Sequence, residues 1–165
     1  MARLSAALRA EGVVAGDRVA GFMPNVPATV VAMLATTSLG AAWTSCSPDF
    51  GVDGVIDRLG QVAPKVLFAA DGYVYGGKRF DSLERVRGIA QKLPSLQRIV
   101  LVPYLTPAPA IADESRAIAL PDYVAAHRAD PIAFEPVAFD APPAVALDDV
   151  TFDEAPHLEP AEPAS

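Results

Sequence analysis

The chain has 165 residues, 52% of them hydrophobic, and a formal net charge of −7, a length that suits one domain or part of one. It has no run of 18 or more apolar residues, so we expect no transmembrane helix and no membrane partner. All 13 Lys and Arg lie at or before Arg128, opposed there by 11 Asp and Glu, and this near balance excludes the basic patch that nucleic-acid binding requires.

Residues 1–11 predict an amphipathic helix, because their apolar side chains recur at spacings of three and four. Arg3 and Arg9 lie within this helical pattern rather than ahead of an apolar block, so the segment does not have the pattern of a signal peptide. We therefore expect a cytoplasmic protein. The apolar residues 18–23 predict a short strand, which the following sequence P-N-V-P ends.

Pro27 suits the first turn of a helix, because backbone N–H groups there have no hydrogen-bond partner within the helix. Residues 28–39 predict that helix and are nearly all apolar, so we expect the sheet to cover one face and other elements to cover the rest. A strand over residues 41–45 then leads into a loop at 46–50. The apolar spacing of residues 51–61 predicts a third helix.

Residues 66–69 predict a compact buried strand, which ends at the turn signal Asp71-Gly72. The sequence Y-V-Y-G-G-K-R, residues 73–79, is interpreted as a glycine-containing loop. A fourth helix over residues 80–93 and a fourth strand over residues 98–102 follow.

Strands and helices alternate with short connections, and the strands look buried on both faces rather than apolar at every second residue. Such strands are typical of parallel sheets covered by helices on both faces. For residues 1–102 we predict a doubly wound α/β fold with a mainly parallel sheet of about four strands flanked by helices. Residues 103–130 are predicted to be an irregular connection with a short helix around 121–129. Nine acidic residues and seven of the 16 prolines follow Arg128, so residues 131–165 are predicted to be a disordered, acidic, Pro/Ala-rich tail.

Several side chains of catalytic type have simple structural interpretations. Cys46 has no His or carboxylate beside it in a nucleophile pattern, and a free Cys is commonly a small buried hydrophobe. One cysteine and two distant histidines, His127 and His157, form neither a disulfide nor the usual zinc site, and both histidines are interpreted as solvated. We predict no catalytic residue and no metal site.

Two alternatives are open at aromatic and acidic positions near the second strand. Trp43 can stack on an adenine ring or belong to the core, and the core is favoured for a strand residue. Asp49, Asp53 and Asp57 are spaced by four and can line one side of a helix around a ligand. A solvated helix face with a capping Asp explains them more simply.

Gly76-Gly77-Lys78-Arg79 also has two interpretations. The glycines allow close approach of a ligand and the cations can pair with a phosphate, or the segment is a turn with solvated side chains. It is not a P-loop, because G-x-x-x-x-G-K-[ST] is absent, as are G-x-G-x-x-G and G-x-S-x-G. W-T-S-C-S-P-D-F-G, residues 43–51, lies where a strand meets a helix, which is where open α/β sheets bind ligands. These residues predict a ligand-facing α/β piece and no reaction.

Residues 16–51 resemble the AMP-forming acyl-CoA synthetases, in the pattern G-D-R-V-A-G-F-M-P-N, an apolar helix and then L-G-A. W-T-S-C-S-P-D-F-G and D-G-Y-V-Y-G-G-K, residues 71–78, more closely resemble the branch of that family that acts on acetoacetate. The resemblance covers residues 2–102. It implies a ligase that converts ATP, acetoacetate and CoA into acetoacetyl-CoA, AMP and pyrophosphate, with CoA and MgATP bound by the intact enzyme.

The resemblance also implies a role for four residues. Ser47, Pro48, Asp49 and Lys78 fall where the family contacts the adenosine-phosphate end of CoA, with Lys78 as the cation for the 3′-phosphate. Lys provides a point charge there rather than the bidentate fork of Arg.

The Ser/Thr/Gly-rich phosphate loop and the catalytic lysine that typify the family do not occur in these residues. We therefore expect a fragment of such a ligase, produced by a frameshift or an early stop, which is inactive alone and binds no cofactor tightly. The alternative is a non-catalytic module that binds CoA or a protein. In that case the apolar helix 28–39 is a candidate surface for association.

Overall fold

The computed structural model describes residues 1–132 and 134. Its main sheet has the strand order β2-β1-β3-β6-β7, and every neighbouring pair is parallel. The strands are β1 (Arg18–Phe22), β2 (Ala42–Cys46), β3 (Val66–Ala70), β6 (Arg98–Val102) and β7 (Ala117–Ala119). The parallel α/β prediction is confirmed, with one strand more than the four predicted.

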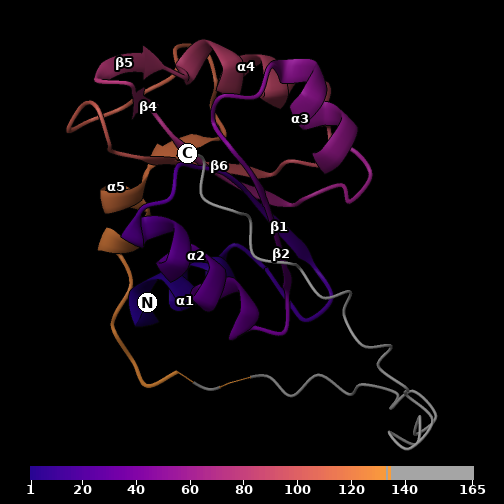
Figure 1. Ribbon diagram of the computed structural model, residues 1–165. Coiled ribbons are helices and arrows are strands. Elements are labelled where there is room, and N and C mark those ends of the chain that lie inside the picture. The colour runs from indigo at the N-terminus through magenta and orange to yellow at the C-terminus, as the bar shows by residue number, and fades with distance from the viewer. Residues whose placement is uncertain (133, 135–165) are drawn as a thin grey trace, which may run out of the picture.

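Helices cover both faces of this sheet, so the fold has three layers (Figure 1). The helices are α1 (Ala2–Ala10), α2 (Pro27–Thr37), α3 (Val52–Leu59), α4 (Leu83–Lys92) and α5 (Leu120–Ala125). Side chains of α1, α2 and α5 share one apolar core with the sheet, and those of α3 and α4 share the other. This arrangement follows from the right-handed crossovers that connect parallel strands.

The central strand β3 shows why the predicted strands lacked alternation. All five of its residues are buried, because Phe68 and its neighbours at every second position enter the core with α1 and α2, while Leu67 and Ala69 enter the core with α3 and α4. A strand that is buried on both faces needs apolar residues at every position.

A separate antiparallel hairpin, β4 (Gly72–Tyr75) and β5 (Lys78–Asp81), replaces the predicted loop at residues 73–79. The prediction was wrong because the two glycines were interpreted as a loop signal. Gly76 and Gly77 have φ of 55° and 74°, which is the left-handed backbone that a two-residue hairpin turn requires. The hairpin also takes the first two residues of the predicted helix 80–93, so α4 begins at Leu83.

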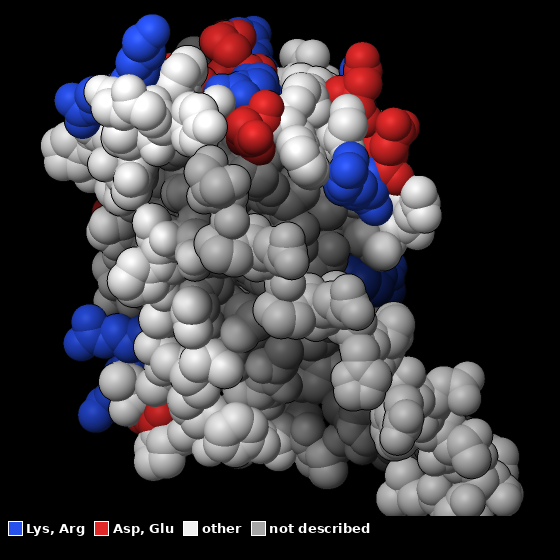
Figure 2. All heavy atoms as spheres, viewed as in Figure 1, with Lys and Arg blue, Asp and Glu red and all other residues white. Residues whose placement is uncertain are grey.

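The apolar helix α2 is covered on only part of its surface. Ala32, Ala35 and Thr36 are buried against the sheet and α1, whereas Val30 and Leu34 are 47% and 43% exposed. The expectation that the helix is covered on most sides is therefore met only in part by the described residues. The helix α2 contains no charged residue, and the spheres beside the grey atoms on this face are mostly white in Figure 2.

Beyond Val102 the structure adds the short strand β7 and the helix α5, which is shorter than predicted. The predicted tail and His157 lie almost wholly outside the described residues. Of the helices that the structure describes, none combines the length and the apolar character needed to span a bilayer.

Candidate functional site

The candidate site is a groove at the carboxyl ends of the strands, where open α/β sheets bind ligands. Because β1 and β2 are parallel, the segments that follow them emerge side by side at one sheet edge. The hairpin rises opposite them and completes a groove of about 500 Å³. The groove is lined by Pro24, Asn25, Ser47, Pro48, Asp49, Tyr73, Val74, Tyr75 and Phe80.

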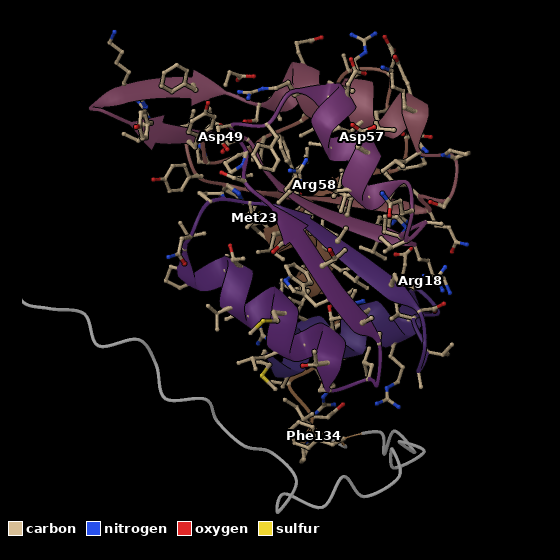
Figure 3. All side chains as sticks on the ribbon, turned by 45° about the vertical axis from the view of Figure 1, so that its right-hand side comes forward. Arg18, Met23, Asp49, Asp57, Arg58 and Phe134 are labelled. Carbon is tan, nitrogen blue, oxygen red and sulfur yellow. The ribbon has the colours of Figure 1, made fainter. Side chains whose placement is uncertain are left out.

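One wall is the loop that follows β2, residues 47–49. Pro48 is buried, while Ser47 and Asp49 are exposed. Asp49 lies between the hairpin and α3 (Figure 3). The structure thus brings together three of the four residues predicted to contact CoA.

The opposite wall is the hairpin. Tyr73 and Phe80 stack with ring centroids 5.0 Å apart and an interplanar angle of 15°. Tyr75 is 77% exposed, and its neighbour Val74 is 48% exposed. This wall therefore presents apolar and aromatic faces to a ligand, and such faces suit the planar base of a nucleotide.

Lys78, the fourth predicted residue, lies on the same hairpin but does not line the groove. It is exposed, and its backbone pairs with that of Tyr75. Within residues 1–132 and 134 its ammonium group has neither a hydrogen bond nor an ion pair, so its charge is available to an anion at the rim.

The buried Asp71 fixes the base of the hairpin. Its carboxylate accepts hydrogen bonds from the backbone N–H groups of Tyr104, Leu105 and Thr106 and from the Thr106 hydroxyl, all at 2.7–2.8 Å. Burial by itself would raise the pKa of Asp71, but these hydrogen bonds outweigh burial and hold its pKa below the ordinary 3.8. The segment after β3 is thereby tied to the segment after β6.

Arg85, in the first turn of α4, connects the two walls. Its Nη1 donates to the Pro48 carbonyl at 2.8 Å, and its Nη2 donates to the Asp81 carbonyl at 3.0 Å. Its guanidinium also lies 5.4 Å from the centre of the Tyr73 ring. The sequence gives no local signal for this role, because the Pro48 carbonyl is 37 residues away along the chain.

The other candidate residues lie outside the groove. Cys46 is buried, and burial raises the pKa of its thiol to about 11, so the thiol is protonated at neutral pH. Trp43 is half-buried and packs against the core, with its ring centroid 6.1 Å from that of Phe68, in line with the structural role favoured from the sequence. Asp53 is exposed and pairs with Lys92 at 2.6 Å.

A second hollow, of about 420 Å³, lies between α1 and residues 130–132. No strand end opens into it, so it lacks the convergence of loops that marks the groove. In the part of the chain that the structure describes, no three His, Cys, Asp or Glu side chains group together as metal ligands.

Known proteins with similar sequences and structures belong to one enzyme family. The model of a family described as AMP-binding enzyme matches residues 1–152. The acetoacetyl-coenzyme A synthetase of Rhizobium meliloti (strain 1021) is 48% identical over 143 residues, which are 86% of this chain and 22% of that protein. The acetoacetyl-CoA synthetase of Mus musculus is 43% identical over 148 residues, with the same coverage.

The solved structure of the acetoacetyl-CoA synthetase from Streptomyces lividans is similar with a TM-score of 0.76 and 44% sequence identity. The match covers 84% of this chain and 21% of that one. The chain therefore spans about a fifth of the length of these relatives, and it includes both walls of the groove.

Proposed function

The chain belongs to the AMP-binding enzyme family, and from that premise we propose that it is an early part of a ligase that joins acetoacetate to CoA at the expense of ATP. Within this part, the groove takes the adenosine-phosphate end of CoA. The observation that carries the proposal is that the loop 47–49 and the hairpin with Lys78, which are distant in sequence, face each other across one groove.

The chemistry of the groove suits that end of CoA. The hairpin offers aromatic faces to a planar adenine, and Asn25 and Ser47 offer polar groups to the ribose. Lys78 offers an unpaired cation to the 3′-phosphate at the rim. A lysine there attracts the phosphate as a point charge, without the bidentate geometry of Arg.

The test is a titration of the chain with CoA and with dephospho-CoA, which lacks the 3′-phosphate. We expect weak binding of CoA and a preference over dephospho-CoA of roughly tenfold, the ratio that corresponds to about 1.4 kcal/mol for one charged contact. Lys78→Ala removes this preference. In Lys92→Ala, which loses only an exposed ion pair with Asp53, the preference is retained. Equal CoA affinity in Lys78→Ala and the parent chain contradicts the assignment of Lys78.

We also propose that the 165 residues alone do not catalyse acetoacetate activation. Adenylation requires donors that neutralise the developing charge on the phosphates, and the Ser/Thr/Gly-rich segment typical of the family is not among these residues. The assay is acetoacetate-dependent release of pyrophosphate from ATP. Release above the background without acetoacetate would contradict this expectation.

A non-catalytic module that binds CoA or a protein is the second candidate, favoured by the exposed apolar side chains of α2. A chain that elutes as a single species in size-exclusion chromatography and unfolds cooperatively favours the module. Insoluble or molten material favours an enzyme part that needs the remaining structure of its relatives.

A further inference from the structure

We propose that Arg85 is a positioning residue that sets the separation of the two walls of the groove. This inference rests on the proposed CoA-binding function, because the groove that Arg85 shapes is the one assigned to CoA. Arg85 does not line the groove, so it acts through the segments to which it is hydrogen-bonded.

The guanidinium reaches both walls at once. One nitrogen is hydrogen-bonded to Pro48 in the loop wall and another to Asp81 at the end of the hairpin, while its plane lies near the ring of Tyr73. A planar fork with several donors can hold two carbonyl groups in a fixed relation, whereas the single ammonium of Lys cannot reproduce that geometry.

The loop wall has few other restraints. Within the described part of the chain, Arg85 is the only side chain that donates a hydrogen bond to residues 47–49. Pro48 has no N–H to donate in return, and the backbone bond from Phe50 to Ser47 is long, at 3.3 Å. By contrast, the hairpin is fixed at its base by Asp71 and by the bond from Arg79 to the Leu105 carbonyl. Loss of Arg85 therefore affects mainly the loop.

The place of Arg85 in α4 is not explained by the stability of the helix. The amino end of a helix carries a partial positive charge, so a cation in the first turn is unfavourable there. The acidic Glu84 beside it is the residue type that the helix itself favours. The contacts with Pro48, Asp81 and Tyr73 offset this unfavourable interaction and explain the arginine at this position.

The test compares Arg85→Lys and Arg85→Met in the full chain, with Arg87→Lys and Arg87→Met as controls on the same helix. Arg87 makes only an exposed contact of 4.0 Å with Glu84. The first measurement needs no ligand: the backbone amide chemical shifts around Asp49 and Tyr73. Both Arg85 variants are expected to shift amides in both walls, and the Arg87 variants in neither.

The second measurement is binding of CoA and dephospho-CoA. Both Arg85 variants are expected to bind each ligand roughly tenfold more weakly, because a charge-assisted hydrogen bond is lost. The ratio of the two affinities is expected to equal that of the parent. An unchanged ratio of CoA to dephospho-CoA affinity identifies a positioning role. Loss of a direct phosphate contact, as in Lys78→Ala, lowers that ratio instead. Arg85→Lys that binds like the parent, or a ratio that falls in Arg85→Met, overturns the inference.

The CoA titration tests the proposed function, and the amide shifts test the positioning role independently of it. If the parent chain does not bind CoA, the proposed function fails, and the amide shifts still decide whether Arg85 couples the walls. Shifts confined to α4 overturn the positioning role whether or not CoA binds. Because Arg85→Lys keeps the charge and most of the side-chain volume, it provides a folded variant if Arg85→Met does not fold.

Discussion

At the scale of single residues, the buried carboxylate of Asp71 accepts more hydrogen bonds than any other carboxylate in the described part of the chain. Asp71→Asn keeps the shape of the side chain but replaces one acceptor oxygen by a donor, which faces N–H groups that need an acceptor. We expect a loss of about 2 kcal/mol in the free energy of unfolding at pH 7, the size typical of hydrogen bonds to a charged group. Urea unfolding of the two proteins measures it.

The stabilisation that Asp71 provides should decrease as the pH falls. The folded pKa of Asp71 is lowered from 3.8, so its stabilising contribution is present above that value and is lost as the pH falls through the lower folded pKa. The difference between the parent and Asp71→Asn should therefore shrink below about pH 4. A difference that stays constant from pH 7 to pH 3 contradicts this account of the carboxylate.

At the scale of elements, the turn between β4 and β5 depends on the left-handed backbone of Gly77. A Cβ there meets no atom within 4 Å, so the cost of substitution is conformational and not steric. Gly77→Val should destabilise the hairpin by roughly 1–2 kcal/mol, whereas Gly77→Asn, which tolerates this conformation, should cost less.

Trypsin provides the measurement, because β5 begins with Lys78 and Arg79. Cleavage after these residues is expected to be faster in Gly77→Val than in the parent and close to the parent rate in Gly77→Asn. Equal rates in the valine variant and the parent show that the turn does not limit opening of the hairpin.

The elements differ in how well the sequence predicts them. The strands β3 and β6 follow from continuous apolar runs and the helices from helical spacing, which are local patterns. β2, A-W-T-S-C, was predicted although it is only partly apolar. The hairpin was missed although Y-V-Y and K-R-F flank a Gly-Gly pair, because short polar strands resemble a loop. β7 was missed because three residues, A-I-A, carry no period and owe their conformation to pairing with β6.

The candidate site combines residues that the sequence singles out with residues that it does not. Ser47, Pro48 and Asp49 were assigned through the family resemblance and line the groove, and their contact with CoA stays a prediction. Arg85 and Asp71 were not found, because their partners are 37 and 33–35 residues away and only the fold brings them together.

At the scale of the whole molecule, the side of α2 with Val30 and Leu34 is an exposed apolar surface among the described residues. Val30→Ser with Leu34→Ser should change stability little, because both side chains are nearly half exposed, and should reduce association of the chain at high concentration. Ala35→Ser, at a buried position of the same helix, should destabilise the fold instead. Sedimentation equilibrium and thermal unfolding distinguish the two effects. Identical association in the parent and the double variant excludes this surface.

The strand order also makes the two walls of the groove mechanically unequal. The hairpin continues from β3, a central strand with a neighbour on each side, whereas the loop 47–49 continues from β2, which pairs with β1 alone among the described strands. Fluctuations grow from the centre of a sheet toward its edge, where fewer contacts restrain the backbone. We therefore expect a ligand to displace the loop 47–49 more readily than the base of the hairpin, which Asp71 holds.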